Sequence, residues 1–452
     1  MGVFPPISFS GSSIQYCFKL TQHYRNLVYF CAMISTKNIF LVLLLLFACA
    51  HLSAQELSQQ IVAGRENSPA QMQKPYIIYI SADGFRHDYA EKYQAKNLLA
   101  LKATGVQAVS MKPSYPSVTF SNHYTLATGM YPSHHGIVNN SFYDPNRKQI
   151  YLKKDASAIK DSTWYGGLPI WALAEQQKML TAAFYWLGSE TAVQGIRPTY
   201  WYNFNNKIPM DARLEAVKNW LLLPAEKRPH LIAFYFPEVD VAGHDFGSNA
   251  KETGEAVKLV DDCVGKMVEL TKSAGLDVNF VFVSDHGMTE SDNKNTMPLP
   301  NLIDTTKFVV PNGDALLQIY AKNKRDIQPL YLKLRAAAVD YDVYLTTKMP
   351  KRWHYRAKDN KDGRIGDIIL IPRLPKIFNL TGKPTNIGKH GFDNAMPDMQ
   401  AVFYAWGPAF KKGFTINSFE NVHVYPLLAK ILGLQYSHQI DGKLAVLAPV
   451  LR

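Results

Sequence analysis

The sequence predicts an α/β fold with a mostly parallel central sheet flanked by helices and a smaller inserted α+β subdomain. Three apolar runs, at 76–82, 231–236 and 278–283, are rich in β-branched and aromatic residues, and each leads into acidic or histidine residues. Continuous runs of this length are typical of strands buried on both faces of a parallel sheet. The more polar, proline-containing stretch 291–389 indicates the inserted subdomain.

Residues 1–54 are expected to be a leader, and 55–452 the catalytic domain. Starting at Met33, a lysine, a leucine-dominated run over 39–50 and a small-residue site ending at Ala54 resemble a secretory signal peptide. The run is too short for a comfortable membrane span. We therefore expect a periplasmic or secreted protein without a membrane span, and a lipid anchor through Cys49 is the less favoured alternative.

The cysteine count and the net charge indicate which compartment and which partners to expect. Cys263 is the one cysteine of four that would remain after cleavage, so no intrachain disulfide is expected, which fits a bacterial periplasm. Its apolar neighbours at helical spacing predict a core position. The net charge of +12 comes without a dense Lys/Arg run. It predicts a surface that attracts small anionic substrates rather than a stable nucleic-acid complex.

Helices are expected between and after the strands. The predicted helices cover 90–104, a turn over 122–127, 170–180, 327–338 and 422–432, the last ending at Gly433. Short strands at 342–346 and 367–371 are expected in the subdomain, and the chain returns to the main sheet through 399–406. Thr119 and Ser121 are good N-cap residues for the turn at 122–127, so a hydroxyl would lie at a positive helix end. A plain helix cap is the alternative for Thr119.

Acidic and histidine side chains follow the predicted strands and would converge at one edge of the sheet. Asp240 and His244 are four residues apart, which puts them on one face of a helical turn, and Asp285 and His286 are adjacent at a strand end. The full candidate set is Asp83, Asp240, His244, Asp285, His286 and His390. Three carboxylates and three imidazoles make two oxygen/nitrogen sites, which suit Zn²⁺ better than calcium or magnesium.

The chain after about residue 74 resembles the nucleotide pyrophosphatase/phosphodiesterase family of the alkaline phosphatase superfamily, in a single-domain bacterial form. The motifs are Asp-Gly-Phe-Arg at 83–86, Thr-Phe-Ser-Asn-His-Tyr-Thr-Leu at 119–126, Tyr-Pro-Ser-His-His-Gly-Ile-Val at 131–138, Trp-Tyr-Gly-Gly-Leu-Pro-Ile-Trp at 164–171, Ser-Asp-His-Gly at 284–287 and His-Gly-Phe-Asp-Asn at 390–394. Ser121 departs from the proline that is common in the family. The resemblance implies an alkaline-phosphatase-like fold.

The resemblance also implies roles for the candidate residues. Thr119 would be the nucleophile and a metal ligand, and Asn140 would contact a phosphoryl oxygen. One zinc would be held by Asp83, Asp285 and His286, and the other by Asp240, His244 and His390. Substrate contacts are implied for Phe120, Asn140, Trp186, Glu190, Phe204 and Tyr235, with a base held between the rings of Phe120 and Phe204. Ordinary core packing is the alternative for each aromatic residue.

We therefore expect a secreted two-zinc phosphodiesterase and nucleotide pyrophosphatase. It would cleave phosphodiester or phosphoanhydride bonds of nucleotides and release nucleoside monophosphates through a phosphothreonine intermediate. The alternative among enzymes is a relative that prefers phosphomonoesters or choline-type phosphodiesters, although no arginine adjoins Thr119. A metal-stabilised binding protein without turnover is the alternative from another class, and the complete set of six ligands disfavours it.

Overall fold

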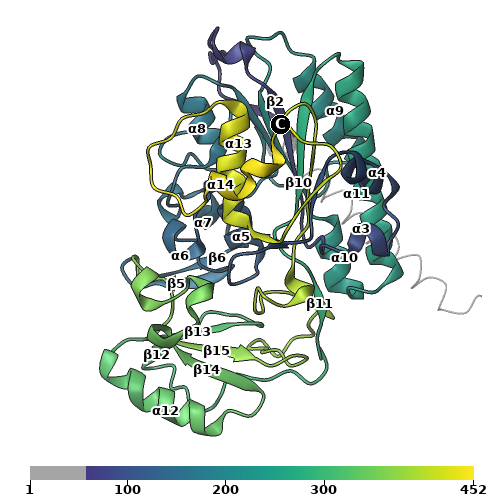
Figure 1. Ribbon diagram of the computed structural model, residues 1–452. Helices are drawn as coiled ribbons and strands as arrows, with labels where there is room; N and C mark the ends of the chain where they lie inside the picture. The colour runs from purple at the N-terminus through teal and green to yellow at the C-terminus, as the bar shows by residue number, and fades with distance from the viewer. Residues whose placement is uncertain (1–57) are drawn as a thin grey trace, which may run out of the picture. The chain divides into compact units, whose positions relative to one another are not determined.

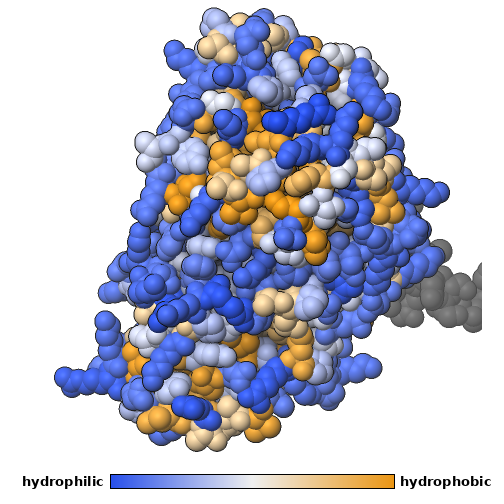
Figure 2. All heavy atoms as spheres, viewed as in Figure 1, coloured by the Kyte–Doolittle hydropathy of each residue, from blue (hydrophilic) through white to orange (hydrophobic). Residues whose placement is uncertain are grey.

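The computed structural model describes residues 58–452 (Figure 1). The predicted signal peptide, the start at Met33 and the lipidation site at Cys49 lie outside these residues. Within 58–452, every helix is too short or too polar to cross a bilayer. Hydrophilic side chains cover most of the face seen in Figure 2, and apolar side chains are gathered there in smaller areas.

A nine-stranded sheet forms the centre of the structure. Its strands, in spatial order, are β1 (Gln60–Ile61), β8 (Tyr200–Tyr202), β7 (Thr181–Phe184), β9 (Leu231–Phe236), β2 (Tyr76–Ala82), β10 (Val278–Val283), β17 (Phe403–Trp406), β3 (Val106–Ala108) and β18 (Phe414–Ile416). All run in one direction except β1 and β17. The three predicted apolar runs are β9, β2 and β10, which lie side by side in the middle. The predicted fold class is therefore confirmed.

Helices cover both faces of this sheet (Figure 1). One face packs against α5 (Thr119–Thr128), α8 (Ile170–Gln176) and α13 (Val424–Leu432), and the other against α4 (Lys96–Thr104), α9 (Met210–Leu221), α10 (Glu238–Phe246) and α11 (Lys251–Ser273). Successive residues of β2 point to opposite faces, as in any strand, so Ile77 and Ile78 belong to different halves of the core. Cys263 is buried on α11, as predicted, and burial raises the pKa of its thiol to about 11.

Several predicted helices have different bounds in the structure; the one expected over 170–180, for example, is α8, which ends at Gln176. The helix expected over 90–104 is divided into α3 (Tyr89–Lys92) and α4, because Gln94 between them has a left-handed φ of 56°. The turn expected over 122–127 begins earlier, at Thr119, and Val118 in extended conformation takes the N-cap position. Neither Thr119 nor Ser121 is therefore the cap, which corrects that part of the prediction.

The stretch between β10 and β17 forms a separate antiparallel sheet, which lies at the lower end of Figure 1. Its strands, in spatial order, are β12 (Phe308–Val309), β13 (Leu317–Ala321), β15 (Ile368–Pro372) and β14 (Tyr341–Leu345), and α12 (Ile327–Ala337) packs on it. An apolar cluster joins this subdomain to the hairpin of β5 (Ser141–Asp144) and β6 (Gln149–Leu152); Phe142 of the hairpin and Ile369 of β15 both belong to it.

Candidate active site

The ends of three central strands bring the predicted carboxylates together. Asp83 directly follows β2, Asp285 comes two residues after β10, and Asp240 lies in the first turn of α10, which follows β9. His244 is one turn further along α10. Ligand atoms of Asp83, Asp285 and His286 lie within 4.8 Å of one another, and those of Asp240, His286 and His390 do so as well. Of the eight predicted catalytic and metal-binding residues, all except Asn140 belong to this cluster or contact it.

Each carboxylate of this cluster has one oxygen that accepts no hydrogen bond from the described part of the chain. Within residues 58–452, Asp83 Oδ1, Asp240 Oδ1 and Asp285 Oδ2 are buried and accept no hydrogen bond. A buried polar atom without a partner costs on the order of 1–3 kcal/mol, more when the group is charged. Three such oxygens at one point are expected where cations bind.

The three histidines present the matching lone pairs. His244 Nδ1 lies 2.7 Å from the carbonyl of Gly388, His286 Nδ1 lies 2.8 Å from that of Gly287, and His390 Nδ1 lies 2.9 Å from that of Ser117. A carbonyl can only accept, so each Nδ1 carries the proton and each Nε2 is left with a lone pair. These Nε2 atoms face carboxylate oxygens: those of His244 and His390 lie 3.4 and 3.7 Å from Asp240 Oδ1.

The ionisation of the cluster also indicates that a cation belongs there. Burial and the charges of Asp285 and Asp240 raise the pKa of Asp83 well above its usual range. Burial and the neighbouring histidines hold the pKa of His390 well below its usual range. A bound dication would offset the free-energy cost of ionising Asp83, and the neutral imidazole of His390 could bind it. The residues therefore fit two metal ions with oxygen and nitrogen ligands.

Thr119 lies beside this cluster, at the first position of α5. Its side chain is almost completely buried, and its hydroxyl oxygen is 3.3 Å from His286 Nε2. Asn140 lies at the same helix end, where its Oδ1 accepts a hydrogen bond of 3.0 Å from the backbone N–H of Phe120. The amide nitrogen of Asn140 is therefore left as a free donor within the described chain.

Sequence reasoning missed His123, which connects the predicted nucleophile Thr119 to the predicted metal ligand Asp285. Its Nδ1 lies 3.0 Å from the Thr119 carbonyl oxygen and 3.3 Å from Asp285 Oδ2, while Nε2 lies 2.8 Å from Ser81 Oγ. His123 is fully buried. Because backbone and carboxylate oxygens accept, Nδ1 carries the proton and Nε2 accepts from the Ser81 hydroxyl. The spacing of four residues from Thr119 on one helix is the signal that could have indicated it.

The predicted substrate contacts differ in how accessible they are. Phe204 is 49% exposed, and its ring lies 6.4 Å from that of Tyr235. Glu190 accepts the backbone N–H of Phe204 at 2.8 Å, so this carboxylate holds the exposed ring in place. Phe120 is buried in the cluster that joins the hairpin to the subdomain. The Tyr235 hydroxyl donates to Asp83 Oδ2 at 2.6 Å. Tyr235 therefore helps to hold the predicted metal ligand Asp83.

Trp186 requires a correction. It is fully buried, stacks on Tyr79 with 4.4 Å between ring centroids, and donates its indole N–H to the carbonyl of His123 at 3.3 Å. None of its indole surface is open to a substrate. The physical reason is that β7 ends at Phe184, two residues earlier, so the ring points back under α5 into the core.

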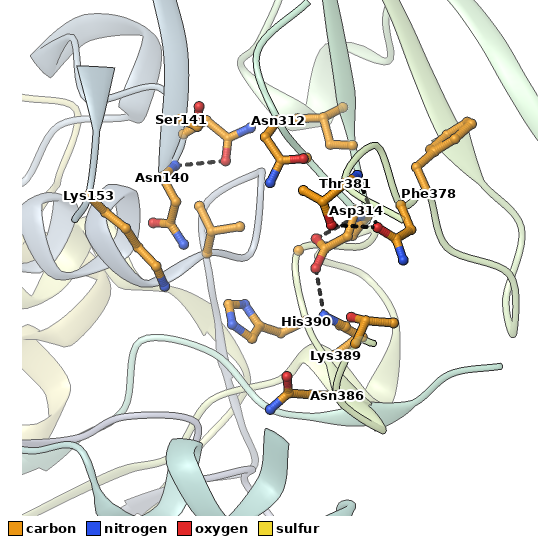
Figure 3. A pocket seen from close by; sticks show the side chains of 18 of the residues that line it. Asn140, Ser141, Lys153, Asn312, Asp314, Phe378, Thr381, Asn386, Lys389 and His390 are labelled. Atoms are coloured by element: carbon orange, nitrogen blue, oxygen red, sulfur yellow. Dashed lines mark hydrogen bonds and ion pairs between the residues drawn. The ribbon is translucent and has the colours of Figure 1, made fainter. Parts of the chain in front are cut away.

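A cavity of about 570 Å³ opens beside His244 and His390 (Figure 3). Asn140 and Lys153, from the ends of the β5–β6 hairpin, line one side of it, and the subdomain residue Asp314 lines the other. Lys389, next to His390, forms an ion pair of 2.9 Å with Asp314. This ion pair joins the subdomain to the segment that carries a predicted ligand.

Comparison with known proteins gives a consistent result. The family model described as Type I phosphodiesterase / nucleotide pyrophosphatase matches residues 77–393. An uncharacterized pyrophosphatase/phosphodiesterase of Schizosaccharomyces pombe is 34% identical over 392 residues, which cover 83% of this chain and 80% of that protein. Venom phosphodiesterase 2 of Crotalus adamanteus is 34% identical over 82% of this chain, and the match spans 47% of the venom protein.

Solved structures agree. Murine ectonucleotide pyrophosphatase / phosphodiesterase 5 matches with a TM-score of 0.76 and 28% identity, covering 84% of this chain and 100% of that one. An inactive threonine-to-alanine variant of the murine protein, solved in complex with AMP, matches with a TM-score of 0.77 and 27% identity over the same shares. With a matched segment that includes every candidate metal ligand and Thr119, this chain belongs to the type I phosphodiesterase / nucleotide pyrophosphatase family of hydrolases.

Proposed function

We propose that the protein is a secreted two-zinc phosphodiesterase and nucleotide pyrophosphatase that releases nucleoside monophosphates through a phosphothreonine intermediate. The observation that carries the proposal is the position of the Thr119 hydroxyl, 3.3 Å from His286 Nε2 and beside buried carboxylate oxygens without partners. The murine relative solved with AMP supports a nucleotide as the substrate. Export to the periplasm or beyond is supported by the leader sequence alone.

Two sets of side chains would hold the metal ions. Asp83, Asp285 and His286, together with the Thr119 oxygen, would hold one, and Asp240, His244 and His390 would hold the other. Mixed carboxylate and imidazole ligands favour zinc. When bound, the ions supply positive charge to the attacking and leaving oxygens of an in-line displacement.

The proposed reaction consists of two displacements at phosphorus, and Thr119 takes part in both. Thr119 loses its hydroxyl proton to solvent, and its oxygen forms a bond to phosphorus while the bond to the leaving oxygen breaks and the electron pair departs with that oxygen. The nucleoside phosphate is then esterified to Thr119. Water attacks phosphorus next, the bond to Thr119 breaks, and Thr119 takes up a proton as the monophosphate leaves.

Two features of α5 stabilise the phosphoryl group during both steps. The amide N–H of Asn140 would donate to a non-bridging oxygen, and the hydrogen bond that Asn140 Oδ1 accepts from the Phe120 backbone N–H orients this amide. The N-terminal end of the helix adds favourable dipole charge. Because Val118 is the N-cap residue, the Thr119 hydroxyl makes no capping bond and is available as the nucleophile.

A comparison of three chromogenic esters tests the proposal. We expect a nitrophenyl ester of AMP to be cleaved much faster than nitrophenyl phosphate or nitrophenyl phosphocholine, and a zinc chelator to abolish all cleavage until zinc is restored. Preference for nitrophenyl phosphate would identify a monoesterase, and preference for the choline ester would identify a choline-type diesterase. Activity that survives complete removal of metal would contradict the two-metal assignment.

A further inference from the structure

We propose that Lys389 and Asp314 are positioning residues for one of the two metal ions, because their ion pair ties the inserted subdomain to the strand that holds two of the ligands. The inference rests on the proposed function, which requires both ions. The first metal site is the proposed set Asp83, Asp285 and His286, and the second metal site is the proposed set Asp240, His244 and His390. The ion pair would support the second metal site and not the first.

A two-residue strand, β16 (Gly388–Lys389), lies against the ligands of the second metal site. The carbonyl of Gly388 accepts the Nδ1 proton of His244 at 2.7 Å, and Lys389 directly precedes His390 in the chain. The strand is in close contact with α10, because a Cβ added to Gly388 would lie 2.0 Å from the carbonyl oxygen of Gly243. A shift of β16 would therefore displace His390 and the hydrogen-bond acceptor of His244 together.

Two kinds of contact hold β16 in this place. Its backbone pairs antiparallel with β11 (Thr289–Glu290). Its charged side chain, Lys389, reaches Asp314 in the loop between β12 and β13 of the subdomain, with 2.9 Å between Nζ and Oδ2 (Figure 3). Asp314 is itself held, since its carbonyl accepts the N–H of Phe378 at 2.9 Å and its Oδ1 accepts that of Ala315 at 2.7 Å. The ion pair thus joins β16 to an anchored loop of the subdomain.

The burial of Lys389 makes this contact stronger than an ordinary surface ion pair. Its side chain is only 9% exposed, and Asp314 is the one hydrogen-bond or ion-pair partner of its Nζ atom within residues 58–452. Removing one partner of a desolvated pair leaves an uncompensated charge, which is costly. Without Asp314 the ammonium group is expected to turn towards water, and the constraint on β16 is lost. A dication bound at His390 would repel the unpaired ammonium group further.

The first metal site is held by the central sheet and not by the subdomain. Asp83 Oδ2 accepts a hydrogen bond of 2.6 Å from the hydroxyl of Tyr235 on β9. Asp285 Oδ1 accepts one of 3.1 Å from the backbone N–H of Gly84, which follows β2. Neither contact involves β16 or the loop between β12 and β13. Loss of the ion pair is therefore expected to weaken the second metal site selectively.

Zinc titration of the metal-free protein against a chromophoric chelator measures the two zinc affinities without any turnover. We expect Asp314→Asn to weaken one of them about tenfold, at the lower end of the range for residues that orient metal ligands, and to leave the other unchanged. Lys389→Met should do the same. The double variant should lose no more than either single variant, because all three lack the same interaction.

Asp342→Asn is the matched control, because Asp342 pairs with Arg373 on the same subdomain. The two carboxylates are equally exposed, 43% for Asp342 and 44% for Asp314, but the Arg373 side chain is 58% exposed. Asp342→Asn should leave both zinc affinities unchanged. In a His244→Ala background, which lacks a ligand of the second metal site, Asp314→Asn should have no further effect. That result would identify the weakened site as the second one.

The outcomes separate this inference from the proposed function. If the protein binds two zinc ions and Asp314→Asn weakens the second, but no nucleotide ester is cleaved, the proposed function fails and the inference stands. If nucleotide esters are cleaved and both zinc affinities are unchanged in Asp314→Asn and Lys389→Met, the proposed function stands and the inference is wrong. An equal loss at both sites, or additive losses in the double variant, would also overturn it.

Discussion

The position of the Thr119 hydroxyl depends on the residues that hold the Thr119 backbone and the proposed metal ligand Asp285. His123 Nδ1 donates to the Thr119 carbonyl at 3.0 Å and lies 3.3 Å from Asp285 Oδ2, and Ser81 holds the ring from the other side. A single buried imidazole thus contacts both the proposed nucleophile Thr119 and the proposed metal ligand Asp285. Residues that orient metal ligands in this way typically change metal affinity or activity about 10–100-fold when they are lost.

We predict that His123→Ala weakens zinc binding and lowers kcat by about 10–100-fold, with little change in KM for a nucleotide. Zinc affinity is measured by competition with a chromophoric chelator, and kcat at saturating zinc. Ser81→Ala is the matched control, because it removes the contact to Nε2 but leaves the contacts of His123 Nδ1 with the Thr119 carbonyl and Asp285, and it should cost much less. Equal zinc affinity in His123→Ala and the wild type would show that His123 has a packing role only.

Phe204 tests the nucleotide side of the site. Its ring is half-exposed and packs edge-on against Tyr185, with 5.2 Å between centroids. If a base stacks on it, Phe204→Ala should lose roughly 1–3 kcal/mol of binding, seen mainly as a higher KM for nucleotides. Bis-nitrophenyl phosphate has no base and should be cleaved almost as before. An equal loss on both substrates would mean that the change distorts the site.

At the scale of elements, the start of α4 depends on a carboxylate from another helix. Asp261 of α11 accepts the backbone N–H of Leu98 at 2.7 Å and that of Asn97 at 3.1 Å. Ala95, the N-cap residue of α4, has no side chain that could do this. The first turn of α4 is therefore satisfied only when α11 is packed against it.

Asp261→Ala should destabilise the protein by about 1–3 kcal/mol, because it leaves two N–H groups of the first turn without an acceptor. Urea unfolding measures the change in free energy. The neighbouring Asp262→Ala is the control, because Asp262 is exposed and its change should fall within about 0.5 kcal/mol. Equal stability of the two variants would show that this cap contributes nothing.

The length of each element explains which parts of the fold could be predicted from the sequence. Strands β2, β9 and β10 were predictable because each is a long apolar run. The two-residue β1 and the three-residue β18 were missed, because such short strands have no periodicity and depend on pairing with their neighbours. The division between α3 and α4 depends on the backbone of Gln94, which composition does not reveal.

At the scale of the whole molecule, the rest of the site depends on how separate elements pack against one another. The convergence of five proposed ligands was predictable because they follow strands of one parallel sheet; these are Asp83, Asp240, His244, Asp285 and His286. The contacts of His123 and the position of Lys153 on the cavity wall were not predictable, since they depend on how α5 meets β2 and how the β5–β6 hairpin faces the subdomain. Trp186 was misplaced for the same reason: whether an aromatic residue faces a cavity or the core is set by the packing of helices on the sheet.

The central claim is that Thr119 attacks the phosphorus of a nucleotide while two zinc ions are bound. The most direct measurement is an acid quench of the zinc-loaded enzyme during turnover of ATP, followed by mass spectrometry of its peptides and a determination of zinc per chain. The account predicts two zinc ions and an AMP group esterified to Thr119, with Thr119→Ala retaining zinc but forming no adduct. An adduct on another residue, or rapid turnover by Thr119→Ala, would contradict it.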